Sequence, residues 1–282
     1  DKEIALSKPV TGESSAPTSY NVAAVVQPSV ATDSQHEGDK EAGKEATAEP
    51  TETVSREATG TSGFRNSGEV TSRVVSNWNG FVSALNDNSI QNITISGNVV
   101  ATGDNGNTDN GRVNSVDRTV AINSQGRNVV IQGRNDQASL DLLSNSLKFT
   151  GSSAWNLVFK NLQLATGNSK GAVDLSSTTG ANTVTFENVK SQGSSLYGGG
   201  GNTDVIVKGE TSSTVSDSYR SANGQTQYVQ RNVGSAGHSV LRREANIHDA
   251  KSVTVADGAS LTLNRSSQGD GINLAGGSTV RV

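Results

Sequence analysis

The segments NLVFKNLQ (156–163) and TVTFENVK (183–190) decide the fold that we predict from the sequence. They align without a gap at an offset of 27 residues, with apolar and Asn residues in matching positions. Apolar residues two apart place their side chains on one face of a β-strand. Self-similarity at a period of roughly 20–50 residues is typical of folds built from stacked coils. Because each repeat contains strands and no helix, the pattern predicts a β-helix.

Apolar doublets of the same kind, with one residue between the two members, recur through residues 64–282. Gly, Asn and Ser stand between the doublets and supply turns. The doublets are Ile93/Ile95, Val120/Ile122, Val129/Ile131, Leu140/Leu142, Leu147/Phe149, Leu157/Phe159, Leu162/Leu164, Val173/Leu175, Val184/Phe186, Val205/Val207, Val253/Val255, Leu261/Leu263, Ile272/Leu274 and Val280/Val282. A second alignment, of 253–263 with 272–282 at an offset of 19, indicates the same stacking. We therefore predict an all-β, parallel β-helix domain over 64–282.

Two pairs of residues repeat at the 27-residue offset and predict how successive coils meet. Phe159 and Phe186 occupy equivalent positions in the predicted core. Asn161 and Asn188 are equivalent as well, and we expect them at an inward corner, where side-chain amides pass hydrogen bonds up the stack as in cross-β assemblies. The alternative is that both Asn residues merely occupy turns.

A short amphipathic helix is predicted at about 76–87, in SNWNGFVSALND. Trp78, Phe81, Val82 and Leu85 fall at i, i+3, i+4 and i+7, which places them on one helix face. The terminal coil of a β-helix exposes an unpaired strand edge. We therefore expect this helix to cap the N-terminal end of the stack, with Trp78, Phe81 and Leu85 in its core.

The first 63 residues differ from the rest in composition. They contain 11 acidic and 5 basic residues and all four prolines of the chain. The stretch from 35 to 56 has one valine and no aromatic residue, too little apolar surface to offset the entropy lost on ordering. We predict a disordered, acidic leader over 1–63, with a helix in EAGKEATAE as the alternative. Because the chain stops inside a predicted strand, we expect the β-helix domain to be truncated at its C-terminal end.

Composition excludes several classes of function. The chain has no Cys, three scattered His residues and a net charge of −4. It therefore lacks disulfides and thiolate nucleophiles, and we expect no cofactor, no metal centre and no nucleic-acid partner. The apolar run at 22–26 is far shorter than the ~20 residues of a membrane helix, so no membrane insertion is expected. The loop DNGNTDNG (104–111) alternates oxygen ligands, but its Gly and Glu spacing departs from a calcium loop; we favour a flexible polar loop and leave calcium open.

The residues from about 70 to 282 resemble the pectate-lyase-like adhesive domain of Gram-positive cell-wall-anchored surface proteins. The motifs are W-x-x-F-x-x-A-L (78–85), R-x-V-x-I (118–122), V-x-I-x-G (129–133), the F-x-N repeats, V-x-V-x-G (205–209) and A-N-I (245–247). The resemblance implies a right-handed β-helix, secretion to the extracellular cell-wall surface and adhesion. It also implies attachment to peptidoglycan through a C-terminal anchor outside this sequence.

Some polysaccharide lyases and hydrolases share this type of fold, so the residues that their active sites require are of interest here. A polysaccharide lyase requires clustered carboxylates for calcium and a basic residue, but the acids of 64–282 are mostly isolated. Asn202-Thr203-Asp204 matches one fragment of the polygalacturonase pattern, without the second carboxylate that hydrolysis needs. We therefore predict no catalytic residue and a non-catalytic adhesion module. The alternatives are a carbohydrate-active, lyase-like enzyme and a structural stalk without a ligand.

Ligand contacts of an adhesin are expected on loops that project from the stack. Three polar stretches are long enough: 102–118, 191–203 and 211–239. Tyrosine and arginine combine planar faces with hydrogen-bond donors and suit a host or matrix glycan or protein. The candidate ligand-binding residues are Tyr197, Tyr219, Arg220, Tyr228 and Arg231.

Overall fold

The computed structural model describes residues 71–102, 117–229, 245–265 and 271–272 with their side chains. It also describes the backbone of short strands at 3–5, 11–12, 18–23, 108–109, 112–113, 232–233, 239–240, 269–270, 273 and 279–281. Most of the predicted leader lies outside the described residues, so its disorder stays a prediction. The loop 104–111 also lies largely outside them.

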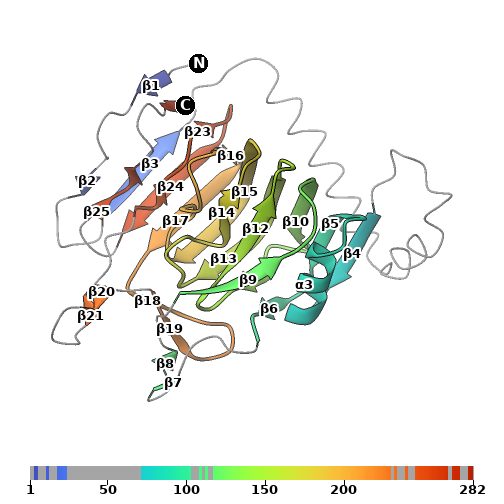
Figure 1. Ribbon diagram of the computed structural model, residues 1–282. Helices are drawn as coiled ribbons and strands as arrows, with labels where there is room; N and C mark the ends of the chain where they lie inside the picture. Colours follow the sequence, from blue (N-terminus) through green and yellow to red (C-terminus); the bar gives the residue numbers. More distant parts are fainter. Residues whose placement is uncertain are drawn as a thin grey trace.

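The protein is built from parallel sheets whose strands follow one another along a stack (Figure 1). The first sheet contains, in order, β4 (Thr71–Val75), β5 (Ile90–Ile95), β10 (Asn128–Gly133), β13 (Asn156–Thr166), β15 (Asn182–Gly193), β16 (Thr203–Lys208), β23 (Ser252–Val255) and β27 (Thr279–Arg281). Its strands turn a corner into a second row of β6 (Asn98–Val100), β11 (Ser139–Asp141), the ends of β13 and β15, β17 (Glu210–Val215) and β24 (Ser260–Arg265). This succession is β-helix-like.

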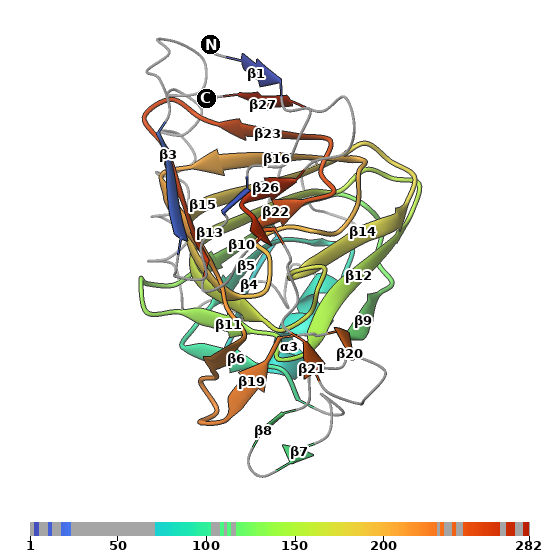
Figure 2. The same cartoon turned by 90° about the vertical axis from the view of Figure 1, so that its left-hand side faces the viewer.

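A third row completes each coil on the other side of the stack (Figure 2). It contains β9 (Arg118–Ile122), β12 (Asn145–Gly151) and β14 (Val173–Thr178), followed by the pair β22 (Ile247–His248) and β26 (Ile272–Asn273). A separate sheet joins β18 (Ser218–Arg220), β19 (Thr226–Tyr228), β8 (Arg112–Val113) and β7 (Thr108–Asp109). The remaining strands are β1 (Glu3–Ala5), β2 (Thr11–Gly12), β3 (Thr18–Ala23), β20 (Asn232–Val233), β21 (Ser239–Val240) and β25 (Gly269–Asp270).

The strand registers test the two alignments made from the sequence. β13 and β15 pair in parallel with Leu157 opposite Val184 and Phe159 opposite Phe186, which confirms the offset of 27. The offset of 19 is wrong, because Val253 pairs with Val280. The alignment of 253–263 with 272–282 matched strands from two different sides of the coil, since β26 pairs with β22 and not with β23.

The core consists of the inward members of the apolar doublets. Phe159 and Phe186 are fully buried and stack with ring centroids 5.7 Å apart and an interplanar angle of 18°. A buried Phe contributes roughly 1.5–3 kcal/mol through the apolar area that it removes from water. Parallel registers therefore place like residues in contact from one coil to the next, as the sequence predicted.

Asn161 and Asn188 occupy the corner between the first and second rows. Their φ angles of 51° and 52° are in the left-handed region, which Asn tolerates better than most residues. The Asn188 side-chain amide donates to Asn161 Oδ1 at 3.3 Å, so the expected amide contact between coils is present. The expected inward position is wrong: Asn188 is exposed, because the left-handed turn directs the side chain outwards. Gly209, with φ of 60°, follows at the next corner.

Helix α3 (Trp78–Leu85) lies within the predicted range of 76–87, beside β4 and β5 (Figure 1). Asn77 caps its N-terminus by accepting a hydrogen bond from the Gly80 amide at 2.8 Å, which satisfies one of the free N–H groups of the first turn. Trp78, Phe81 and Leu85 are all buried, as predicted.

The stretch 191–203 does not project as a loop, which corrects the prediction made for it. Residues 193–200 are buried, and Tyr197 forms a parallel bridge with Ile247. The run of four glycines at 198–201 packs tightly against β14. A Cβ atom on Gly199 would lie 2.0 Å from the Val173 carbonyl oxygen. Glycine is therefore required here for close approach of two backbones.

Candidate functional site

The hairpin of β18 and β19 is held against the outer face of the second row by one buried carboxylate. Asp141, which is 3% exposed, accepts hydrogen bonds from the Tyr219 hydroxyl and the Ser221 hydroxyl, both at 2.6 Å. Its Oδ1 atom also accepts from the Leu143 amide at 3.0 Å. Hydrogen bonds to an ionised acceptor are stronger than those between neutral groups. Asp141 therefore fixes the position of the hairpin relative to the stack.

Tyr219 lies in a tight setting at the base of this hairpin. Burial, and then the neighbouring Asp141 carboxylate, raise the pKa of the Tyr219 phenol well above its ordinary value, so it remains a hydrogen-bond donor. A Cβ atom on Gly193 would lie 2.8 Å from Tyr219 Cδ1, and Gly193 has a φ of 99°. The ring therefore packs directly on a glycine backbone.

A pocket lies between the hairpin and the outer face of β6, β11, β13 and β15, on the side where Figure 2 shows β19 next to β6 and β11. Its volume is about 180 Å³. It is lined by Asn98, Ser139, Leu140, Asp141, Gln163, Leu164, Ala165, Gln192, Arg220 and Ala222. Most of these residues belong to strands, so the walls of the pocket are preformed.

Polar side chains dominate the chemistry of this pocket. The Ser139 hydroxyl donates to Asn98 Oδ1 at 2.6 Å, and Gln163 Nε2 contacts the Asp136 carbonyl oxygen at 3.4 Å. Among the described residues, the side chains of Gln192 and Arg220 have no hydrogen-bond or ion-pair partner. Gln192 and Arg220 are both exposed. The pocket thus offers amide and guanidinium groups to a ligand.

The predicted ligand-binding residues occupy different environments. Arg220 is exposed and lines the pocket, and Tyr228 is half-buried in β19 of the same hairpin. Tyr219 is buried and positions the hairpin. Tyr197 is fully buried and donates to the Gly200 carbonyl oxygen at 2.8 Å, so we do not retain it as a ligand-binding residue. Arg231 lies outside the described residues.

Asn98, Gln163 and Gln192 were missed as candidate ligand-binding residues in the sequence. Gln163 pairs with Ser139, and Ser139 pairs with Asn98, so three outward side chains form one column across neighbouring coils. Gln192 stands in the adjacent column, opposite Ala165. The sequence contained part of this signal, because side chains alternate along a strand and Gln163 stands between the core residues Leu162 and Leu164.

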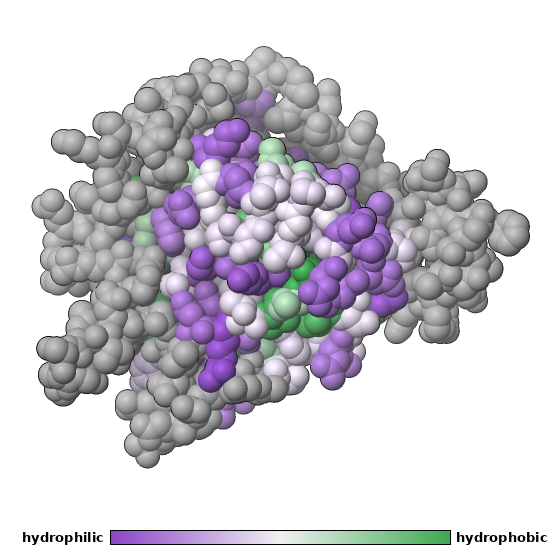
Figure 3. Space-filling view, in the orientation of Figure 1, coloured by the Kyte–Doolittle hydropathy of each residue, from purple (hydrophilic) through white to green (hydrophobic). Residues whose placement is uncertain are grey.

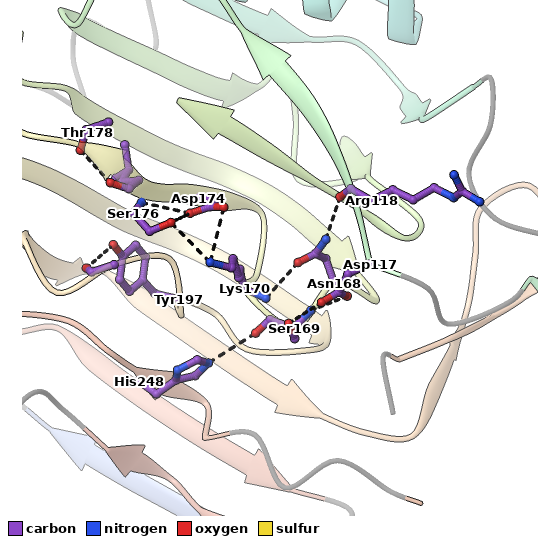
Figure 4. Close-up of polar contacts among 12 residues, drawn as sticks. Asp117, Arg118, Asn168, Ser169, Lys170, Asp174, Ser176, Thr178, Tyr197 and His248 are labelled. Atoms are coloured by element: carbon purple, nitrogen blue, oxygen red, sulfur yellow. Dashed lines mark hydrogen bonds and ion pairs between the residues drawn. The ribbon is translucent and has the colours of Figure 1, made fainter. Parts of the chain in front are cut away.

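A second polar cluster, shown in Figure 4, brings together the residue types of a catalytic triad. The Ser169 hydroxyl donates to Asp117 Oδ2 at 2.5 Å, and His248 Nε2 lies 3.4 Å from the Ser169 carbonyl oxygen. A nucleophilic serine requires a base within hydrogen-bond reach of its hydroxyl. Here His248 contacts the main-chain carbonyl of Ser169. The Ser169 hydroxyl instead donates to the Asp117 carboxylate. The geometry suits a structural link between coils.

Lys170, Asp174 and Ser176 form the neighbouring part of this cluster (Figure 4). Asp174 accepts hydrogen bonds from the Ser176 hydroxyl at 2.5 Å and from the Ser176 amide at 3.0 Å, and Lys170 Nζ lies 3.6 Å from its Oδ2. Burial, with the Asp249 and Asp174 carboxylates as smaller contributions, raises the pKa of Tyr197 far above its ordinary range. These groups hold the turn after β13 against β14.

Within the described part of the chain, no group of three or more His, Cys, Asp or Glu side chains is arranged to hold a metal ion. The same residues include no helix that is both long enough and apolar enough to cross a membrane. Where Figure 3 is coloured, the surface is mostly hydrophilic or of intermediate hydropathy, with a smaller apolar area.

Part of the chain is similar to a known protein family. Residues 72–197 match the family model described as "Putative pectate lyase-like adhesive domain". The match runs from β4 into the segment between β15 and β16, so it includes α3 and the first coils. This match over residues 72–197 confirms the resemblance stated from the sequence. The description of the family supports a role in surface adhesion.

Solved structures are similar to part of the chain. The Lactobacillus reuteri 53608 SRRP is 22% identical, with a TM-score of 0.49, over 64% of this chain and 55% of that chain. The Lactobacillus reuteri 100-23 SRRP is 16% identical, with a TM-score of 0.46, over 67% of this chain and 50% of that chain. This chain therefore spans about half the length of these two structures. A comparison with curated proteins gives no match.

Proposed function

We propose that the protein is a non-catalytic adhesion module of a bacterial cell surface. The match of residues 72–197 to an adhesive domain family is the observation that carries this proposal. The ligand is a host or matrix glycan or protein, and the protein is secreted by a Gram-positive cell. Attachment to peptidoglycan occurs through a C-terminal anchor, which places the module on the cell wall.

The handedness of the stack and the role of its helix are part of this proposal. The parallel rows wind as a right-handed β-helix solenoid, and α3 caps its N-terminal end. Support for this comes from the parallel registers between successive coils and from the burial of Trp78, Phe81 and Leu85 at that end of the stack. A rigid stack of this kind holds binding groups at fixed positions, which lowers the entropy lost on binding.

The non-catalytic assignment is supported by the contacts of the polar groups. Asp141 is occupied by Tyr219, Ser221 and the Leu143 amide, and therefore has little capacity left to act as a base. Ser169 lacks the Ser–His contact of a nucleophile. The strand that carries Asp204 continues the first row, and the Asp204 carboxylate accepts from the Ser252 hydroxyl at 2.6 Å.

Binding of the full chain to a glycan array and to a panel of extracellular-matrix proteins tests the proposal. We expect saturable binding that is weakened by Arg220→Ala, which alters the pocket, and unchanged by Lys148→Ala, a half-buried cation on β12. Failure to bind any glycan or matrix protein would contradict adhesion and favour a structural stalk. Release of unsaturated uronide from pectin, alginate or glycosaminoglycans, followed by ultraviolet absorbance with and without calcium, would instead indicate a lyase.

A further inference from the structure

We propose that the pocket beneath the hairpin binds one neutral pyranose unit of a glycan, recognised through its hydroxyl groups. This inference rests on the proposed adhesive function and names the ligand class for one site. The volume of about 180 Å³ is below the ~300–1,000 Å³ of pockets that enclose drug-sized ligands. The pocket therefore admits a single small unit, with the remainder of a chain outside it.

Charge in the pocket favours a neutral ligand. Its lining contains one carboxylate, Asp141, and one guanidinium, Arg220, so the formal charges of the lining sum to zero. The Asp141 carboxylate is buried and accepts hydrogen bonds from neutral hydroxyl and amide groups, so its negative charge opposes any anion that enters. Arg220 is exposed, and water screens its attraction for an anion.

The remaining polar groups match hydroxyls. Asn98, Gln163 and Gln192 each carry an amide that both donates and accepts hydrogen bonds, which is the capacity that a sugar hydroxyl requires. They stand on β6, β13 and β15, and the strands of one row are spaced about 4.8 Å apart. Ala165 and Ala222 add small apolar surface for the C–H groups of a sugar ring.

A peptide ligand fits the same pocket less well. β11 pairs in parallel with β6 on one edge and with β13 on the other, so its backbone offers no open edge for an added strand. The adjacent part of β13 pairs with β15 in the same way. Recognition must therefore come from side chains, which favours the hydroxyl-rich ligand over the extended peptide.

Titration calorimetry and saturation-transfer NMR of the full chain test this inference. The probes are neutral gluco-, galacto- and manno-oligosaccharides, each compared with a matched uronate oligosaccharide. We expect at least one neutral probe to bind, with at least tenfold weaker affinity for Gln163→Ala combined with Gln192→Ala. Gln125→Ala, an exposed glutamine outside the pocket lining, is expected to bind like the unmodified chain. Equal melting temperatures show that the variants remain folded.

Each other outcome has a definite meaning. Stronger pocket-dependent binding of the uronate probes would overturn the charge argument, and neutral binding that ignores both glutamine substitutions would overturn the choice of pocket. If no sugar probe binds while the chain still binds matrix proteins, the inference fails and the adhesive function stands. Absence of both kinds of binding would contradict the proposed function as well.

Discussion

Tyr219 donates its phenolic hydrogen to Asp141 at 2.6 Å across 78 positions of sequence, and this bond joins the hairpin to a coil formed much earlier in the chain. Because Asp141 also accepts from Ser221, one carboxylate controls the position of the pocket wall. The pocket is therefore as stable as the docking of this hairpin.

The Asp141→Asn variant is expected to loosen the hairpin. An Asn side chain loses the negative charge and half of the acceptor capacity, and a hydrogen bond to a charged group is worth about 1.5–3 kcal/mol. Hydrogen exchange of residues 218–228 is expected to accelerate by roughly tenfold or more, since about 1.4 kcal/mol corresponds to a factor of ten. Asp136→Asn on an exposed loop is the control; equal exchange in both variants would contradict the role of Asp141.

Replacing Phe159 with Ala is expected to lower the free energy of unfolding by about 3–5 kcal/mol, because it empties a fully buried position. The stacked Phe186 then loses its partner in the adjacent coil. Urea denaturation followed by circular dichroism measures the change. Val158→Ala, a half-buried position on the opposite face of β13, is expected to cost far less; similar losses would show that β13 is not packed as described.

Asn161 tests the contribution of the left-handed corner. Ala at a φ of 51° is expected to cost about 1–2 kcal/mol of stability, whereas Gly accepts this φ. The Asn161→Gly variant loses mainly the exposed amide contact with Asn188, and we expect a smaller loss. Thermal unfolding of the two variants distinguishes these effects. A larger loss for Gly than for Ala would show that the amide contact outweighs the backbone conformation.

Gly199→Ala is expected to destabilise the protein by about 2–3 kcal/mol through overpacking, because its Cβ atom would lie 2.0 Å from the Val173 carbonyl oxygen. Gly201→Ala, at an exposed position of the same run, serves as the matched variant. Denaturation midpoints provide the measurement. Two variants of equal stability would show that the close backbone approach at Gly199 does not constrain the fold.

The anchoring of α3 is expected to weaken in acid. Burial opposes ionisation of Asp87, but hydrogen bonds from Ser89 and the Arg73 guanidinium outweigh it and lower the pKa of Asp87 below its ordinary value of 3.8. This carboxylate therefore contributes stability above about pH 4, which is lost as the pH falls through the folded-state pKa. The Asp87 side chain is half-buried and partly screened by water, so we expect an effect below about 1 kcal/mol.

Urea denaturation at a series of pH values between neutral and about pH 2 checks this prediction. Ser89→Ala removes the hydrogen bond that the Ser89 hydroxyl donates to Asp87 at 2.7 Å and keeps the one from the Ser89 amide at 2.9 Å. The substitution should therefore move the loss of stability to higher pH. An unchanged pH profile in this variant would show that Asp87 does not control it.

Local sequence determined the core and the coil repeat. Alternating apolar residues such as Leu157 and Phe159 can bury one face only in a strand, and equivalent residues 27 positions later specify the parallel register. The helix was equally predictable from the spacing of Trp78, Phe81 and Leu85, because the 3.6 residues per turn of an α-helix are a local property of the chain. These patterns need no knowledge of distant residues.

Only the tertiary structure decided the site. Asp141, Gln163, Gln192 and Arg220 come from separate coils and a hairpin, and no spacing in the chain shows that they enclose one pocket. Tyr197 was predicted from the sequence to bind a ligand, yet the close packing of the neighbouring glycine run against β14 leaves it buried. Burial and side-chain convergence depend on how coils of unequal length stack, and that is set by long-range packing rather than by the local pattern of residues.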